Sequence, residues 1–270
     1  MPTDRSSILL AMPVFNEASS IEGVLTRVRA MARDVLVVDD GSTDGTTAIL
    51  DRHPVEVIRH AHNRGYGRAM QEILRRADAD GYAWVITMDC DEQHEPEQIP
   101  DFVHALERGG ADVVSGSRYL TEHAGDDDAP EARRRVNMAI TAELNDRFDL
   151  GLTDAFCGFK AYRVAATARL ALDADGYDFP LQFWVQAVAN GLRVRELPVR
   201  RIYKDLNRSF GPELDDPERR LRAYRETMHR ELRRCRHRLR ARAMQGLTCA
   251  EGPRSEEHTS ELQSRVDISY

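Results

Sequence analysis

The chain lacks several features that define whole classes of protein. Its four cysteines are widely scattered and form no C-x-x-C pair: Cys90, Cys157, Cys235 and Cys249. That spacing argues against a disulfide framework or a cysteine-based zinc site and fits a reducing compartment. No apolar run approaches the roughly 18–20 residues that a membrane-spanning helix needs, and the first residues show no signal-peptide pattern. We therefore expect a cytoplasmic protein.

What is present suffices for one large domain with an appendage. Hydrophobic residues make up 41% of the 270 positions, enough for a substantial core. The formal net charge of −7 is unevenly distributed, because residues 217–244 contain eleven arginines against three glutamates. One end of the chain is therefore expected to meet an anionic partner or to be strongly solvated.

Apolar runs alternate with helical patterns over the first 115 residues. The expected strands are 7–12, 34–40, 55–59, 82–88 and 112–115, and the expected helices are 22–31, 43–52, 65–76 and 96–108. This alternation predicts an α/β fold, a mostly parallel sheet with helices on both faces. Further along we expect a mobile acidic loop, a helix, a strand and a second helix start: 122–130, 131–148, 192–203 and 215–218.

Polar side chains follow four of the expected strands. They are Asn16 and Glu17, Asp39 and Asp40, Asp89 and Asp91, and Ser117 and Arg118. Ligands bind in such sheets at the carboxyl ends of the strands, so these residues should share one site. Asp39 and Asp40 could instead cap the next helix, but their place at a strand end favours a functional role.

The pair Asp89 and Asp91 is the best candidate for a metal site. Side chains at positions i and i+2 of an extended backbone point the same way, so both carboxylates can face one ion. Oxygen ligands of this kind suit Mg²⁺ or Mn²⁺, which also bind substrate phosphates. We interpret His94 as a structural hydrogen-bonding residue, with a ligand role as the alternative.

Six motifs occur in order along the chain. They are P-V-F-N-E (13–17), V-V-D-D-G-S-T-D-G-T (37–46), N-R-G-Y-G (63–67), D-C-D-E-Q-H (89–94), G-S-R-Y (116–119) and T-D-A-F-C-G-F-K-A-Y-R (153–163). Together they resemble family 2 glycosyltransferases, most closely the dolichol/polyprenyl-phosphate mannosyltransferase branch, over about residues 7–211. The resemblance implies a GT-A fold and inverting transfer of a hexose from a nucleotide-diphosphate sugar, of the GDP-mannose or UDP-glucose type.

The resemblance also implies roles for single residues on the donor side. The expected nucleotide-sugar-binding residues are Pro13, Phe15, Glu17, Asp39, Asp40, Asp89, Cys90, Lys204 and Arg208. Asp89, Asp91 and Gln93 would hold the Mg²⁺ or Mn²⁺ ion and, through it, the diphosphate. Cys90 stands where the family has a small residue. Asn63, Gly65 and Gly67 are expected to shape a turn that leaves room for the donor.

The acceptor decides whether the reaction needs a general base. A phosphate acceptor is already anionic, and Arg118, Arg134 and Arg135 would bind it. A hydroxyl acceptor needs a base within hydrogen-bond reach, and Asp178 falls where such family members place theirs. The candidate catalytic residues are therefore Asp91, Asp178 and Arg118. Polyprenyl phosphate is the favoured acceptor, and a soluble or glycan hydroxyl is the alternative.

The arginine-rich segment has an apolar stripe at helical spacing. Its members are Leu221, Tyr224, Met228, Leu232, Cys235 and Leu239. Such a helix could pack onto the domain, pair with a second copy in a homodimer, or lie peripherally on the anionic inner face of a membrane. Salt-sensitive binding to anionic liposomes tests the last alternative.

We expect three parts in the chain: residues 1–211 as the glycosyltransferase domain, 212–245 as the basic amphipathic extension, and 246–270 as a disordered tail. From about residue 254 the tail resembles a translated sequencing adaptor, so we expect it not to belong to the fold.

Two rival functions fit the sequence less well. A sugar-1-phosphate nucleotidylyltransferase would need a G-x-G-T-R loop where this chain has P-V-F-N-E. A non-catalytic protein that binds membrane or nucleic acid through its arginines would not need an intact Asp89/Asp91 pair. Nucleic acid is therefore not expected as a partner.

Overall fold

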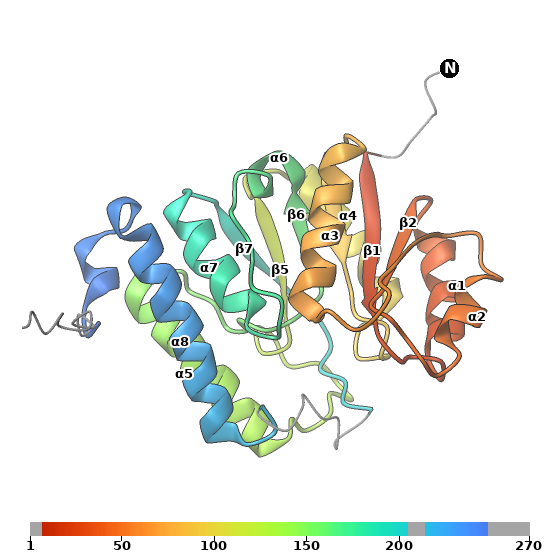
Figure 1. Ribbon diagram of the computed structural model, residues 1–270. Helices are drawn as coiled ribbons and strands as arrows, with labels where there is room; N and C mark the ends of the chain where they lie inside the picture. Colours follow the sequence, from red (N-terminus) through yellow and green to blue (C-terminus); the bar gives the residue numbers. More distant parts are fainter. Residues whose placement is uncertain (1–6, 205–213, 248–270) are drawn as a thin grey trace, which may run out of the picture.

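The computed structural model describes residues 7–204 and 214–247, and a seven-stranded sheet lies at the centre of this part (Figure 1). The strands are β1 (Ile8–Val14), β2 (Val35–Asp39), β3 (Glu56–Arg59), β4 (Trp84–Thr87), β5 (Val113–Ser117), β6 (Lys160–Arg163) and β7 (Val194–Pro198). Their order is β3-β2-β1-β4-β6-β5-β7, and only β6 runs antiparallel to its neighbours. The expected α/β fold with a mostly parallel sheet is confirmed.

Eight α-helices connect or cover these strands in the described residues. They are α1 (Ile21–Met31), α2 (Thr46–Leu50), α3 (Tyr66–Ala79), α4 (Ile99–Glu107), α5 (Glu131–Phe148), α6 (Val164–Thr167), α7 (Phe179–Ala189) and α8 (Pro217–Cys235). Short 3₁₀ helices occupy Pro96–Gln98, Arg236–Arg238 and Ala241–Met244. The predicted helix 131–148 coincides with α5. Asp216 caps α8 by accepting a hydrogen bond from the Arg219 N–H at 2.8 Å.

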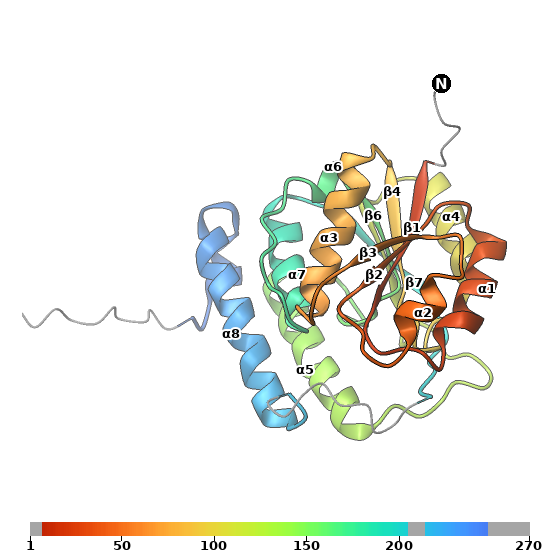
Figure 2. The ribbon, with the colours of Figure 1, turned by 45° about the vertical axis from the view of Figure 1, so that its right-hand side comes forward.

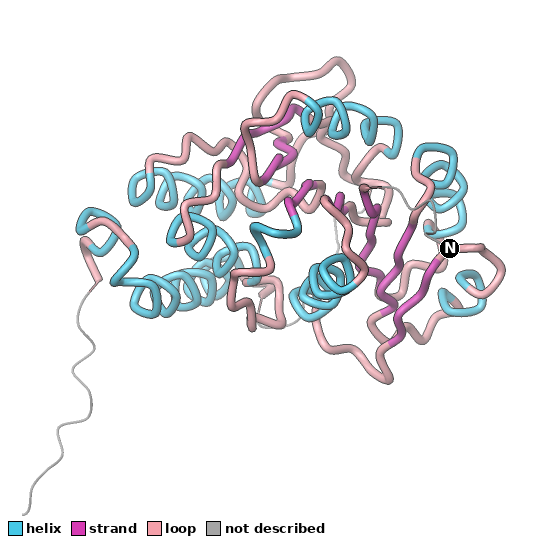
Figure 3. The backbone as a smooth tube through the Cα atoms, turned by 90° about the horizontal axis from the view of Figure 1, so that it is seen from above, coloured by secondary structure: helices cyan, strands magenta, loops and turns pink. Residues whose placement is uncertain are grey.

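Helices lie on both faces of the sheet (Figures 2 and 3). Successive side chains of a strand point to opposite faces, and β1 shows the consequence. Leu9 and Ala11 belong to the apolar cluster shared with α3, α5, α7 and α8. Leu10 and Met12 belong to the cluster shared with α1 and α4. Strand β1 is therefore apolar along its whole length, and polar residues follow where it ends.

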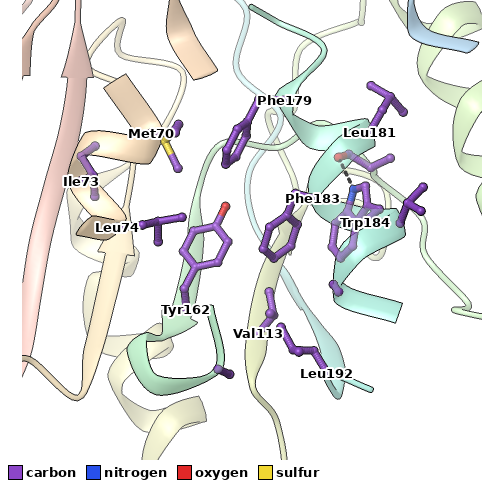
Figure 4. Packing of buried hydrophobic residues seen from close by; sticks show 14 of the residues in the cluster. Met70, Ile73, Leu74, Val113, Tyr162, Phe179, Leu181, Phe183, Trp184 and Leu192 are labelled. Carbon is purple, nitrogen blue, oxygen red and sulfur yellow. Dashed lines mark hydrogen bonds between the residues drawn. The ribbon is translucent and has the colours of Figure 1, made fainter. Parts of the chain in front are cut away.

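Aromatic side chains join α7 to the antiparallel strand β6 (Figure 4). The rings of Tyr162 and Phe183 meet edge to face, with their centroids 5.1 Å apart. The Trp184 indole N–H donates to the Ala155 carbonyl at 2.9 Å. Because Trp184 is completely buried, this bond holds the segment before β6 in one position. That segment forms part of the site described below.

The basic helix α8 packs against α5 and α7. Its apolar stripe is buried in the same cluster as those helices. Glu231, fully buried on this face, accepts hydrogen bonds from the side-chain amides of Gln182 at 3.0 Å and Gln186 at 2.9 Å. Of the three interpretations of the stripe, the structure shows packing onto the domain. No helix in residues 7–204 and 214–247 is long and apolar enough to cross a membrane.

Candidate functional site

The carboxyl ends of β1, β2, β4 and β5 border one cavity of about 680 Å³. Most of the residues singled out in the sequence line it: Pro13, Phe15, Glu17, Asp40, Asp89, Cys90, Asp91, Gln93, Arg118 and Lys204. The parallel register places these ends at one edge of the sheet, as expected. Sequence positions far apart along the chain are therefore brought to a single cavity.

The Asp89–Asp91 turn is held in place by a buried histidine. The Asp89 backbone N–H donates to Nδ1 of His94 at 2.9 Å, and the other ring nitrogen of His94 lies 3.7 Å from the Cys157 sulfur. Burial lowers the pKa of His94 to about 4, so the ring is neutral at pH 7. These contacts support the structural interpretation of His94.

All three residues of the turn border the cavity, but Cys90 is mostly enclosed by the core. Cys90 is 2% exposed and packs in the core cluster shared with α1 and α4. The Gln93 N–H donates to the Asp91 carboxylate at 3.1 Å, which closes the turn. The described residues contain no group of three His, Cys, Asp or Glu side chains able to hold a metal. Two carboxylates at the edge of a cavity fit Mg²⁺ or Mn²⁺, which take the remaining ligands from water and substrate phosphates.

The Asp89 carboxylate lies directly against Gly158. A Cβ at position 158 would stand 2.4 Å from Oδ2 of Asp89, and the Gly158 carbonyl accepts a hydrogen bond from the Thr87 hydroxyl at 2.9 Å. The backbone of the C-G-F turn therefore cannot easily retreat, so a larger residue would displace the carboxylate.

We expect Gly158→Ala to lower kcat/KM for the reaction at this cavity by about 10²-fold, because a shift of roughly 1 Å at a reacting site has this effect. The matched control is Gly23→Ala in α1, where a Cβ would meet nothing within 4 Å. Steady-state kinetics with thermal melts of both variants provide the measurement. Unchanged kinetics in a folded Gly158→Ala protein would contradict the proposed crowding.

Asp39 and Asp40 hold different parts of the backbone. Asp40 accepts hydrogen bonds from the Arg64 and Gly65 N–H groups at 2.9 and 2.8 Å, and its carboxylate lies 2.6 Å from Nδ1 of His60. Asp39 is buried and does not line the cavity. It accepts from the Ser42 N–H at 3.0 Å and the Thr47 hydroxyl at 2.8 Å. Asp39 does not cap α2, whose N-cap is Gly45 without a side-chain hydrogen bond. It holds the loop before α2, whereas Asp40 fixes the N-R-G-Y-G turn at the cavity.

The glycines of that turn leave room for protein backbone. Gly65 has a φ of 101°, a conformation that favours glycine. A Cβ on Gly65 would stand 2.3 Å from the Asp175 carbonyl oxygen, and one on Gly67 would stand 2.1 Å from that of Ala174. The expected turn is present, and the space at both glycines is taken by residues 174–175.

Arg118, which lines the cavity, forms a buried ion pair. Its Nε and Nη2 atoms donate to the two carboxylate oxygens of Asp154 at 2.6 and 3.0 Å, and Asn137 donates to the same carboxylate at 2.8 Å. Burial alone would raise the pKa of Asp154. The Arg118 charge and these hydrogen bonds outweigh it and hold the pKa at about 2. Arg118 is therefore a fixed cation at the cavity.

The structure does not bring all expected residues to the cavity. Arg134 and Arg135 are exposed on α5, and Arg135 lies 3.7 Å from Glu218. Asp178 does not line the cavity either, and its carboxylate accepts a hydrogen bond from the Thr227 hydroxyl at 2.6 Å. Arg208 and the tail from residue 248 lie outside the described residues.

Several lining residues were not identified from the sequence. They are Arg133, Val136 and Asn137 of α5, Phe156 and Tyr177 in the connections between α5 and α7, Pro180 of α7, and Arg220 and Tyr224 of α8. The spacing of Arg133, Val136 and Asn137 is that of one helix face. This spacing identifies Arg133 as the arginine of the 133–135 run that points to the cavity. The identification requires knowing which side of α5 borders the cavity.

The acidic loop 122–130 is tied to the segment after β7. The Arg201 and Tyr203 N–H groups donate to the Asp126 and Asp127 carboxylates at 3.0 and 2.8 Å. The Arg200 guanidinium donates to the Gly125 carbonyl at 2.7 Å. These bonds connect the loop, which was predicted to be mobile, to Tyr203, which lines the cavity.

Comparison with known proteins gives one family. The family model described as glycosyl transferase family 2 matches residues 10–170. The polyprenol monophosphomannose synthase of Mycolicibacterium smegmatis is 31% identical, over 76% of this chain and 80% of its own. The undecaprenyl-phosphate mannosyltransferase of Micrococcus luteus is 31% identical, over 75% of this chain and 86% of its own.

Solved structures share the fold. Glucosyl-3-phosphoglycerate synthase from Mycobacterium tuberculosis, crystallised with Mn²⁺, uridine diphosphate and glucosyl-3-phosphoglycerate, superposes with a TM-score of 0.62 at 22% identity. The match covers 84% of this chain and 79% of that one. Mannosyl-3-phosphoglycerate synthase from Rubrobacter xylanophilus superposes with a TM-score of 0.62 at 19% identity, over 89% and 78% of the two chains.

Proposed function

Because the chain belongs to glycosyl transferase family 2, we propose that it transfers a hexose, with inversion, from a nucleotide-diphosphate sugar to a polyprenyl phosphate. The donor is of the GDP-mannose or UDP-glucose type. One observation carries the proposal: carboxylates at the ends of β1, β2 and β4 share a cavity with arginines from β5, α5 and α8. The carboxylates suit a metal-bound diphosphate, and the arginines suit a second phosphate.

On the donor side, the reaction places negative charge on the departing nucleoside diphosphate. Asp89 and Asp91, with Gln93 beside them, would hold Mg²⁺ or Mn²⁺, which supplies positive charge to the leaving phosphates. Phe15 is 42% exposed while lining the cavity, so it can offer its ring to the nucleobase. Asp40 keeps the turn at residues 63–67 against this end of the cavity.

On the acceptor side, the placement of Asp178 favours a phosphate. A hydroxyl acceptor would need a base at the cavity, and Asp178 instead contacts Thr227 of α8. A phosphate attacks without a base, and Arg118 and Arg133 would bind it. Arg133 takes the role expected for Arg134 and Arg135. The two curated relatives, which are named for polyprenol and undecaprenyl phosphate chemistry, support this choice.

A thermal-shift panel of GDP-, UDP- and dTDP-sugars, with and without Mn²⁺, tests the donor half. At a hundredfold excess over Kd a ligand adds about 2.7 kcal/mol of stability, which in a protein of this size raises Tm by roughly 5–10 °C. We expect such a shift from one nucleotide sugar, and only with the metal. If none of the donors stabilises the protein in a metal-dependent way, the proposed function is wrong.

A further inference from the structure

The helix α8 supplies part of the cavity wall, although it lies beyond the part of the chain matched by the family model. Arg220 and Tyr224 line the cavity and are 7% and 5% exposed. They are four residues apart, so they lie on one face of the helix, one turn from each other. Arg220 and Tyr224 are thus buried at the cavity, whereas the other arginines of α8 are exposed.

The surroundings of Tyr224 are aromatic and apolar. Its ring stacks on Phe156 with centroids 5.1 Å apart, and nearby Tyr66 stacks on Tyr177 at 5.7 Å. All four rings line the cavity together with Val136 and Pro180. The ring faces of this wall suit a hydrocarbon chain better than a diphosphate or a metal ion.

Charge divides the cavity into two sides. Every acidic lining residue in the described part follows β1, β2 or β4: Glu17, Asp40, Asp89, Asp91 and Glu92. Every basic one comes from the other half of the sheet or from its helices: Arg118, Arg133, Lys204 and Arg220. The charge of Arg118 is already matched by Asp154. The basic residues therefore gather on the side of the cavity that carries the aromatic wall, away from the carboxylates.

The position of α8 is fixed by buried polar contacts. Glu231 accepts hydrogen bonds from Gln182 and Gln186 of α7, and Gln182 also accepts from the Asp173 and Ala174 N–H groups at 2.8 Å. At the other end of the helix, Arg220 Nη2 donates to the Asp215 carbonyl at 3.4 Å. These contacts orient Arg220 and Tyr224 in advance, so little ordering is left for the moment of binding.

We propose that α8 builds the acceptor subsite and selects the acceptor. Arg220 contacts the acceptor phosphate, and the Tyr224–Phe156 wall contacts the first isoprene units. A phosphate that carries an apolar chain is thereby preferred over a small hydrophilic phosphate. The inference rests on the proposed function and extends it to residues 217–235.

The test compares steady-state transfer to a ten-carbon isoprenyl phosphate in the wild type, Arg220→Gln, Tyr224→Ala and Tyr224→Phe. We expect Arg220→Gln to raise the KM for this acceptor about tenfold, since a charge-assisted hydrogen bond is lost. Tyr224→Ala should raise it by a similar factor, and Tyr224→Phe should leave it near the wild-type value. The donor KM should stay within about twofold in each variant, which also shows that it is folded.

Selectivity is read from glycerol phosphate as a competing inhibitor. Its inhibition constant should rise in Arg220→Gln and stay constant in Tyr224→Ala, because only the first residue contacts the phosphate. The control is Arg222→Gln, an exposed arginine of the same helix, which should behave as wild type.

The outcomes separate the two proposals. If the wild type transfers no sugar to the isoprenyl phosphate, the proposed function fails and this inference fails with it. If the wild type is active and Arg220→Gln and Tyr224→Ala match Arg222→Gln, only the inference about α8 is overturned. An equal rise in donor and acceptor KM would likewise overturn it, because it would show a general structural role.

Discussion

Asp89→Asn is expected to lower kcat/KM for sugar transfer by about 10³-fold, equivalent to roughly 4 kcal/mol of transition-state stabilisation. The substitution keeps the shape of the side chain and the backbone hydrogen bond to His94. It removes one of two carboxylates available to the ion that stabilises the leaving diphosphate. The nucleotide-sugar thermal shift should lose its dependence on Mn²⁺ at the same time.

The matched control for this variant is Asp101→Asn, an exposed aspartate on α4, the helix that follows the Asp89–Asp91 turn. It should keep wild-type kinetics and the metal-dependent shift. An Asp89→Asn protein that melts like the wild type and retains both activity and Mn²⁺ response would show that the ion is held elsewhere. The metal site proposed here would then be wrong.

Arg118→Gln is expected to destabilise the protein by about 3–5 kcal/mol, since it leaves the charge of a buried partner uncompensated. Asp154 is 0% exposed, and glutamine can replace only part of the bidentate contact. The double variant Arg118→Gln/Asp154→Asn, which removes both charges, should recover much of this loss. Urea unfolding at pH 7 measures all three proteins.

The pH dependence of stability should change sign between these proteins. In the wild type the pKa of Asp154 is about 2, below its unfolded value of about 3.9. The pair therefore stabilises the fold above pH ~4, and its contribution is lost as the pH falls toward 2. Without Arg118, burial raises the Asp154 pKa, so the deficit should shrink as the pH is lowered from 7 toward 4.

The control for the ion pair is Arg195→Gln, an exposed arginine on β7, whose effect should stay within about 0.5 kcal/mol. A loss of similar size in Arg195→Gln and Arg118→Gln would mean that removal of any arginine weakens the fold. An unchanged deficit in the double variant would mean that the hydrogen-bond geometry, and not the charge, stabilises this region.

The strands and the residues at their ends were predictable because both signals are local. The run 35–38 is apolar at every position, a pattern typical of a strand buried on both faces, and Asp39 and Asp40 follow it. In the same way, Asp89 follows the expected strand 82–88. In a parallel sheet such ends necessarily meet. The sequence by itself therefore determined the fold class and the carboxylate side of the cavity, where we propose that the donor binds.

Two elements, α7 and β6, were not predicted, because their sequences lack the alternation of apolar and polar residues that marks a helix or a strand. The helix α7 is apolar on nearly all sides, since it is buried between the sheet and α8, so no polar face marks its turns. The strand β6 has only four residues and pairs with β4 and β5 in the opposite direction. Its place depends on contacts such as the Trp184–Ala155 bond, which join residues far apart in the chain.

Which arginine faces the cavity was decided by tertiary structure alone. Arg133, Arg134 and Arg135 have nearly equal composition and neighbours, and a helix turns by about 100° per residue, so only one can face the site. Tertiary packing also places Asp178 in contact with Thr227 of α8, away from the cavity lining. It turns Arg220 and Tyr224 of the same helix toward the cavity. Sequence determined which chemical groups are available and where each strand ends. The packing of α5, α7 and α8 decided which groups reach the basic side of the cavity, because only the elements that a helix packs against determine which of its faces points to the site.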